Sequence, residues 1–189
     1  MTAIGIILGS TRPHRNGEQV AVWVQERASR RTDATFDLVD LLDYPLPHLD
    51  EPMPAAYGGY VHAHTRAWSA KIAGYDGFVL VTPEYNHSTS AVLKNALDHL
   101  YAEWNNKSVG LVSYGGSGGV RAAEHLRLVC GAMQMADVCQ QVAVPMATEF
   151  VDNYTRFTPS DGSTASLDVL LDQVVSWASA LAPLRAAAS

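Results

Sequence analysis

The chain has few cysteines, no excess of basic residues and no long apolar run. Its 189 residues include two cysteines, Cys130 and Cys139, whose spacing fits no common zinc motif. We expect both to be small buried hydrophobic residues, one on a helix and one on a strand, and not redox groups. The 13 Lys and Arg against 19 Asp and Glu give a net charge of −6, which argues against a nucleic-acid partner.

The sequence also shows no pattern typical of a targeting or membrane-spanning segment. No uninterrupted apolar stretch approaches the roughly 20 residues that a spanning helix needs. The first residues run directly into a strand pattern, without the features of a signal peptide. We therefore expect a cytoplasmic protein with no membrane partner. The length and the 48% hydrophobic content predict one domain over residues 1–183, followed by a frayed alanine-rich tail over 184–189.

Strand and helix patterns alternate along the chain. Apolar runs predict strands over residues 4–8, 36–40, 77–81, 108–113 and 137–144. Helical periodicity predicts helices over residues 17–30, 65–73, 90–104, 119–133 and 166–181, with irregular stretches over 41–54 and 145–163. This alternation predicts an α/β fold, in which helices cover both faces of a parallel sheet. Five such strands fit the flavodoxin-like order 2-1-3-4-5, which brings the loops after strands 1, 3 and 4 together.

The loop after the first strand, Gly9 to Gly17, has the composition of a phosphate site. It carries hydroxyls, an amide and the arginines Arg12 and Arg15 at the start of a helix. Free backbone N–H groups and the positive end of the helix dipole attract anions, and arginine adds charge-assisted hydrogen bonds. The plain alternative for Arg12 is a solvated loop residue.

The loop after the third strand, residues 82–88, can grip a flat polar ligand. Tyr85 offers a ring and Asn86 an amide, and Pro83 stiffens the entry. The plain alternatives are rim packing for Tyr85 and helix capping for Asn86. Glu84 is either a ligand group or half of a salt bridge at an oligomer interface, and we expect His87 to be a hydrogen-bonded loop residue.

The loop after the fourth strand is rich in glycine, with four glycines among residues 115–119. Glycine lets a backbone approach a ligand closely and present bare N–H groups. Each of these glycines also suits a tight strand-to-helix turn, so this loop alone decides nothing. Three such loops, each between a buried strand and a helix, predict a binding crevice.

At these residues the chain resembles the NADPH-dependent FMN reductases of flavodoxin-like fold, a group that includes bacterial quinone, azo-dye and chromate reductases. The resemblance rests on residues 9–12 with 16–17, on 82–88 with 93–98, and on 113–119 with Arg121. The middle motif is the specific one. Many relatives have a proline where this chain has Ser90, which can itself cap the following helix.

The resemblance implies FMN as the cofactor and NADPH or NADH as the co-substrate. Phosphate binding would fall to the first loop and the isoalloxazine ring to the other two. The implied cofactor-binding residues are Ser10, Thr11, Arg12, Asn16, Gly17, Pro83, Glu84, Tyr85, Asn86, Ser113, Tyr114, Gly115 and Gly116. No catalytic side chain is assigned, because the flavin carries the chemistry. No metal site is expected, because His14, His62 and His64 have no carboxylate or cysteine at ligand spacing.

The implied activity is hydride transfer from NAD(P)H to flavin N5, followed by reduction of a quinone, azo compound or flavin in ping-pong order. The alternative is a non-enzymatic flavin protein, either an electron carrier or a redox-responsive binding protein. Arg12 and Arg15 in the phosphate loop, together with the dispersed acidic residues, favour the enzyme. A descendant of the fold that binds no flavin is a third class, since fold alone does not set function.

Family members usually form dimers or tetramers, which implies a homodimer or homotetramer through the helix at 90–104. The helix carries an apolar stripe wide enough to face a partner, formed by Leu93, Leu97, Leu100, Tyr101 and Trp104. Three aromatic residues before it, Tyr57, Tyr60 and Trp68, form either the wall of a substrate mouth or an oligomer contact.

Overall fold

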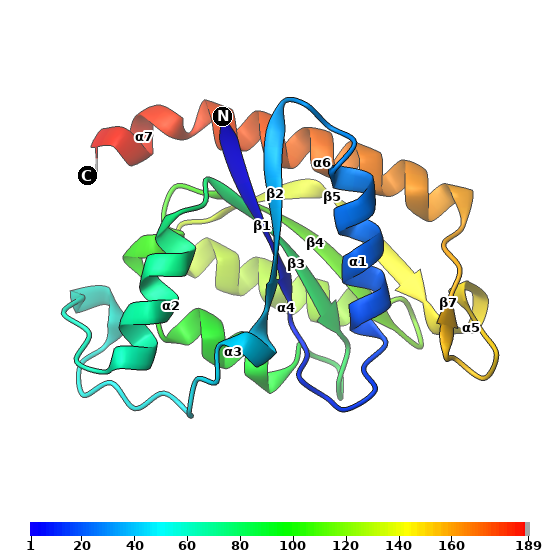
Figure 1. Ribbon diagram of the computed structural model, residues 1–189, viewed down its shortest axis with the longest axis horizontal. Coiled ribbons are helices and arrows are strands. Elements are labelled where there is room, and N and C mark those ends of the chain that lie inside the picture. The colour runs from blue at the N-terminus through cyan, green and yellow to red at the C-terminus, as the bar shows by residue number, and fades with distance from the viewer. Residues whose placement is uncertain (188–189) are drawn as a thin grey trace.

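A computed structural model describes residues 1–187 and shows one parallel five-stranded sheet in the order β2-β1-β3-β4-β5 (Figure 1). The strands are β1 Thr2–Leu8, β2 Ala34–Asp40, β3 Gly77–Pro83, β4 Ser108–Gly115 and β5 Ala136–Pro145. The predicted flavodoxin-like order is confirmed. In register, Ile6 of β1 lies between Leu38 of β2 and Val79 of β3.

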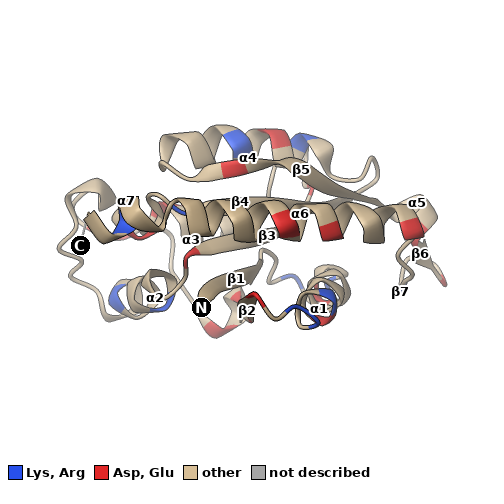
Figure 2. Ribbon diagram, turned by 90° about the horizontal axis from the view of Figure 1, so that it is seen from above, with Lys and Arg blue, Asp and Glu red and all other residues tan. Residues whose placement is uncertain are grey.

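Five main helices cover the two faces of the sheet. They are α1 Gly17–Ala28, α2 Ala63–Ala73, α3 Ala91–Asp98, α4 Val120–Ala132 and α6 Asp161–Ala180. The shorter helical pieces are η1 Leu41–Asp43, η2 Ala55–Tyr57, η3 Ala102–Trp104, α5 Met146–Glu149 and α7 Ala182–Ala187. Figure 2 shows basic and acidic positions together on α1 and α4, whereas α6 carries only acidic positions and α2 only basic ones.

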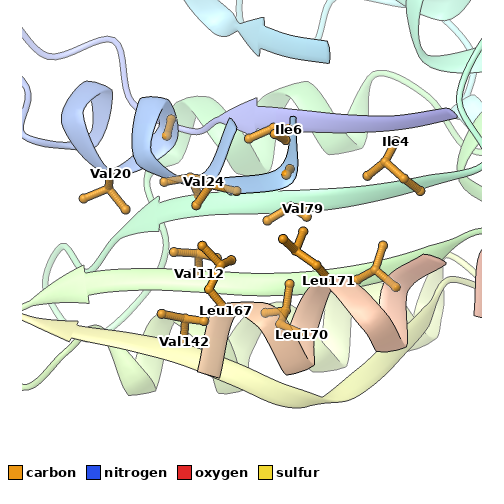
Figure 3. Close-up of a cluster of buried hydrophobic side chains, with 14 of the residues drawn as sticks. Ile4, Ile6, Val20, Val24, Val79, Val112, Val142, Leu167, Leu170 and Leu171 are labelled. Carbon is orange, nitrogen blue, oxygen red and sulfur yellow. The ribbon is translucent and has the colours of Figure 1, made fainter. Parts of the chain in front are cut away.

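Each face of the sheet has its own hydrophobic core. On one face, side chains of the strands meet α1 and α6, as Figure 3 shows for Ile4, Ile6, Val79, Val112, Val142, Val20, Val24, Leu167, Leu170 and Leu171. On the other face, α2, α3 and α4 pack with Ile7, Phe78, Leu80, Val109 and Leu111. Successive strand residues point to opposite faces, so the continuous apolar runs of β1, β3 and β4 supply both cores.

The apolar stripe of α3 is part of the second core and not a surface for a partner. Leu93, Leu97, Leu100 and Trp104 are all buried in the single chain. The expectation that the stripe faces another subunit is therefore wrong for these four residues, whereas Tyr101 is only partly buried. Helical periodicity shows that one face of a helix is apolar, but not whether the sheet or a second chain covers it.

Helix α3 is also shorter than the predicted 90–104. Its start is as expected, because the Ser90 hydroxyl accepts the N–H of Leu93 at 3.2 Å. Its end is set by two buried indoles: Trp68 donates to the carbonyl of Ala96 at 2.8 Å and Trp104 to that of Leu97 at 3.1 Å. The carbonyls at a helix end lack the next turn's N–H partners, and these indoles donate to two of them, although that of Leu97 also accepts the N–H of Leu100 at 3.3 Å. Trp68 is thus a core residue, and neither a substrate wall nor an oligomer contact.

The structure also departs from the sequence analysis elsewhere. Cys130 is buried as expected, whereas Cys139 on β5 is exposed. The predicted loop at 145–163 contains α5 and a small hairpin, β6 Phe150–Val151 with β7 Arg156–Phe157, and α6 already begins at Asp161. Phe157 packs edge-on against Trp23, which fastens the hairpin to α1.

The C-terminal residues continue as helix up to residue 187. Arg185 of α7 donates to Asp76 at 2.7 Å and to the carbonyl of Asn106 at 3.1 Å. Residues 184–187 of the predicted frayed tail are therefore helical in the structure, and residues 188–189 lie outside the described part of the chain. By length and composition alone, the stretch Asp161–Ala187 could cross a membrane. The buried residues of α6 pack on the sheet, in the core that α6 shares with α1.

Candidate functional site

The loops after β1, β3 and β4 meet at one edge of the sheet around a cavity of about 150 Å³. The order of the strands causes this meeting, because these three strands are neighbours and their carboxyl ends lie together. The cavity is lined by Arg12, His14, Arg15, Asn16, Pro83, Glu84, Tyr85, Tyr114, Gly115 and Met146. The crevice predicted from three separate loops thus exists as one site.

The first loop, which borders this cavity, has unpaired donors. Asn16 precedes α1, and its side chain makes no capping hydrogen bond. Within residues 1–187, the backbone N–H groups of Thr11 and Asn16 donate no hydrogen bond, whereas that of Arg12 lies 3.4 Å from the Ser10 hydroxyl. The exposed Arg12 side chain lies beside them. Free N–H groups, a helix N-terminus and an arginine are the features of an anion site.

Arg15 holds the loop in place and is not free for an anion. It donates to Asp40 at 2.7 Å and to the carbonyl of Ser10 at 2.6 Å, with a side chain only 6% exposed. Asp40 ends β2, so this pair joins the first loop to the neighbouring strand. Sequence analysis counted both arginines toward the phosphate loop and assigned only Arg12 to cofactor binding; the structure gives Arg15 a carboxylate partner that lies 25 residues away.

The second loop is a tight turn that a side-chain contact joins to the first loop. Tyr85 and Ser88 exchange backbone hydrogen bonds of 2.9 and 3.1 Å, and the left-handed residues Asn86 and His87 lie between them, with φ of 49° and 76°. Asparagine and histidine tolerate this conformation better than most residues do. The Tyr85 hydroxyl lies 3.3 Å from that of buried Ser10, and Tyr85 as a whole is 37% exposed. Tyr85 therefore bridges the two loops and remains partly open to solvent.

Two side chains of helix α4 hold the second loop in place. Arg121 donates to the Glu84 carboxylate at 2.6 Å, and His125, one turn further, lies 3.0 Å from the Ser88 hydroxyl. Desolvation raises the pKa of Glu84, but the hydrogen bonds from Arg121 outweigh it and hold this pKa below its ordinary value. Of the two roles open for Glu84, the structure shows a salt bridge, formed within the chain and not across an interface.

The third loop is shaped by buried hydrogen bonds. The Ser113 hydroxyl is buried and donates to the carbonyl of Gly118 at 2.8 Å, so it does not face the cavity. Gly118 and Gly119 have φ of 74° and 73°, which only glycine adopts readily. Gly116 has open space around it, whereas Gly115 lies against Glu84.

Tyr114 lies beneath the first loop and does not cover the open face of the crevice. Its ring is buried, and burial raises the pKa of its hydroxyl. The hydroxyl oxygen finds no hydrogen-bond partner of good geometry in the described residues, although Ser10 and Gly17 lie nearby. An unsatisfied buried hydroxyl is costly and calls for an explanation. Here it lies at the start of α1, where the free N–H groups gather.

A second hollow, of about 240 Å³, lies on the other side of the first loop. Thr11 faces this hollow, together with Leu41, Leu42, Tyr44, Pro45, Leu46, Val92, Asn95 and Ala96. The loop after β1 therefore borders both hollows. The cavity beside Arg12 is polar, and the hollow beside Thr11 is mostly apolar. Sequence analysis missed this wall because residues 41–54 show no periodicity, and it missed Met146 because α5 is a single turn.

The hydrogen-bond donors around the cavity fit FMN. A helix N-terminus with free N–H groups, Arg12, Asn16 and an unsatisfied tyrosine hydroxyl suit a phosphate. Tyr85 and the glycine loop leave room for a flat ring beside them, since a Cβ added at Gly116 would meet nothing.

The model of NADPH-dependent FMN reductases matches residues 2–149 of the chain. The chain belongs to this family. It is 49% identical over 132 residues to an NAD(P)H-dependent FMN reductase of Schizosaccharomyces pombe, covering 69% of this chain and 66% of that relative. It is 29% identical over 181 residues to a 2-hydroxy-1,4-benzoquinone reductase of a Burkholderia species, covering 92% and 94% of the two chains.

Among solved structures, the flavoenzyme NAD(P)H:acceptor oxidoreductase FerB of Paracoccus denitrificans matches with a TM-score of 0.72. The match covers 95% of this chain and 98% of that one at 20% identity, which supports the fold. Family membership makes the protein an oxidoreductase that uses FMN with NAD(P)H as co-substrate. The carrier and the flavin-free descendant are thereby set aside.

Proposed function

We propose that the cavity at the carboxyl edge of the sheet holds FMN and that the enzyme passes electrons from NAD(P)H to a small acceptor by a ping-pong mechanism. The meeting of three sequence-distant loops around unpaired N–H donors carries this proposal. Bound FMN would supply two-electron chemistry between the nicotinamide and the acceptor.

The residues of the chain bind and orient in this proposal. Arg12, Asn16 and the N–H groups at the start of α1 hold the phosphate, together with Ser10, Thr11 and Gly17 of the same loop. Pro83, Tyr85 and Asn86 line the ring, and Gly115 and Gly116 border it on the other side. Glu84 and Ser113 act through their hydrogen bonds, which fix the second and third loops.

The acceptor in this proposal is a small flat molecule such as a quinone, an azo compound or a free flavin. The likeness to a benzoquinone reductase and to FMN-dependent NADPH-azoreductases of staphylococci supports this class. The apolar hollow beside Thr11 offers room for part of such a molecule next to the ring site. We further propose a cytoplasmic enzyme with no nucleic-acid or membrane partner.

The test is an anaerobic titration of the FMN-loaded protein with NADPH, following the absorption band of oxidised flavin. We expect rapid bleaching, and recovery of the band when a benzoquinone is added after the nicotinamide is used up. Stable absorption in the presence of excess NADPH would contradict the proposed activity. Recovery only while NADP⁺ is still bound would contradict the ping-pong order.

Arg12→Ala is expected to weaken FMN binding by roughly tenfold or more, since a hydrogen bond to a charged group contributes about 1.5–3 kcal/mol. Riboflavin, which lacks the phosphate, should bind the variant and the wild type equally. Arg30→Ala is the matched control, because Arg30 is an exposed arginine just beyond the C-terminal end of α1. Unchanged FMN affinity in Arg12→Ala would rule out the phosphate assignment.

The proposal also includes a homodimer or homotetramer that uses the outer surface of α3 and α4. A groove of about 380 Å³ runs between these helices, next to Ala55, Ala56 and Leu128. Leu128 of this groove is 76% exposed, and Tyr57, which follows Ala56 in the chain, is 77% exposed. Sedimentation of the wild type and of Leu128→Glu should show an oligomer that the substitution weakens; a wild-type monomer at micromolar concentration would contradict it.

A further inference from the structure

A cluster of metal-ligand side chains lies outside the flavin cavity, where the segment after β2 folds back on α2 and α3. Asp50, His64 and His99 each offer one ligand atom, and these three atoms all lie within 4.8 Å of one another. His64 Nε2 is 3.0 Å from Asp50 Oδ1. Sequence spacing could not reveal this cluster, because its members come from a loop, from the start of α2 and from the end of α3.

A fourth candidate ligand lies at the edge of the cluster. The ring of His62 stacks on that of His64 with centroids 5.2 Å apart. Its Nε2 lies 3.9 Å from Asp50 Oδ2 and 3.2 Å from the Asp50 carbonyl oxygen. Two or three imidazoles with one carboxylate are a ligand set that suits zinc and its neighbours in the first transition row, and not magnesium or calcium.

The cluster is held in place by side chains that are not ligands themselves. Asn95 of α3 donates to the carbonyl of Pro47 at 2.7 Å and accepts the N–H of Leu49 at 3.0 Å, which fixes the loop before Asp50. Glu51 accepts the N–H groups of Val61 and His62 at 2.9 and 3.1 Å, which fixes the start of α2. Such partners preorganise a site, because the ligands need little reordering when an ion binds.

His99 is the buried member of the cluster, and its two nitrogens have different partners. Its Nε2 lies 3.1 Å from the Pro47 carbonyl, which can only accept, so Nε2 carries the proton. Its Nδ1 is then an acceptor and lies 3.3 Å from the Thr65 hydroxyl. Ligation through either nitrogen replaces one of these bonds, and the other then orients the ring, as the partners of metal-bound histidines usually do.

From this geometry we propose a divalent transition-metal site formed by Asp50, His64 and His99, with His62 as a fourth ligand. The bound ion would join the segment 47–64 to the end of α3. That segment continues from the apolar wall at residues 41–46, so the ion would stiffen one side of the hollow beside the flavin cavity. The site lies outside the residues that bind FMN, so it does not depend on the proposed reaction.

The experiment is a calorimetric titration of the FMN-loaded, chelator-treated protein with ZnCl₂, beside the variants Asp50→Asn and His64→Asn. The matched control is His48→Asn, since His48 is an exposed histidine two residues from Asp50. We expect one Zn²⁺ per chain in the wild type and in the control. Each ligand variant should bind at least roughly tenfold more weakly, because even loss of a ligand's partner costs about 10–100-fold.

Two further readouts make the outcome decisive. Co²⁺ should give the visible bands of a four-coordinate ion in the wild type and lose them in Asp50→Asn, and Zn²⁺ should raise the thermal midpoint of the wild type and the control. Circular dichroism confirms that both ligand variants are folded. Absence of saturable Zn²⁺ binding overturns the proposal. So does wild-type affinity in either ligand variant, or an equal loss in His48→Asn.

Discussion

Gly17→Ala is expected to lower the free energy of unfolding by about 1–3 kcal/mol, the usual cost of an extra carbon in a packed site. A Cβ at Gly17 would overlap the hydroxyl oxygen of Tyr114 and come within 3.0 Å of its Cζ and 3.1 Å of Leu8 Cδ1. The ring of Tyr114 is buried and cannot swing out. FMN affinity should fall as well, because the clash displaces the start of α1.

The sign of this effect distinguishes packing from helix propensity. Alanine normally stabilises a helix relative to glycine by roughly 0.5–1 kcal/mol. Gly162→Ala in the first turn of α6 is the matched control, since its nearest neighbour would be Ser160 Oγ at 3.8 Å. Urea unfolding of both variants makes the comparison. If Gly17→Ala proves as stable as Gly162→Ala, the close approach of Tyr114 is not real.

The double variant Gly17→Ala with Tyr114→Phe tests the same contact from the other side. Removing the hydroxyl takes away the closest overlap and should recover part of the lost stability. Tyr114→Phe alone should be neutral or stabilising without FMN, because the hydroxyl is buried without a good partner. Weaker FMN binding by Tyr114→Phe would show that the hydroxyl serves the phosphate.

The sequence predicted the sheet order and the three loops because these features are local. An apolar run ended by a polar loop and followed by a helix marks each βα unit, and the order of such units follows from few topological rules. Gly17 was predicted to be part of the phosphate loop for the same local reason. Its contact with Tyr114 depends on a residue far along the chain, which no local pattern records.

The same limit explains the other differences between expectation and structure. Arg15 of the first loop pairs with Asp40 of β2, and Glu84 of the second loop pairs with Arg121 of α4. The sequence analysis predicted correctly that one face of α3 is apolar, but it placed this face against a second subunit and not against the sheet. The hairpin of β6 and β7 has strands of two residues each, too short for an alternating pattern to appear.

Arg15→Met is expected to destabilise the protein toward the lower end of the roughly 3–5 kcal/mol that breaking a buried ion pair costs. The variant leaves the Asp40 carboxylate unpaired and frees the carbonyl of Ser10, which Arg15 holds at 2.6 Å. Asp40 is 24% exposed, so water offsets part of the loss. FMN binding should weaken too, since the first loop loses its tie to β2.

Arg27→Met is the matched control on the same helix. Arg27 pairs with Asp168 at 2.6 Å, but both side chains are about a third or more exposed, at 32% and 42%. Such surface pairs contribute only about 0–1 kcal/mol, so urea unfolding should separate the two variants clearly. Adding Asp40→Asn to Arg15→Met removes the unpaired charge and keeps the oxygen that accepts the N–H of Leu42 at 2.9 Å. The double variant should therefore be more stable than Arg15→Met alone; equal stability would mean that the unpaired charge is not the cause of the loss.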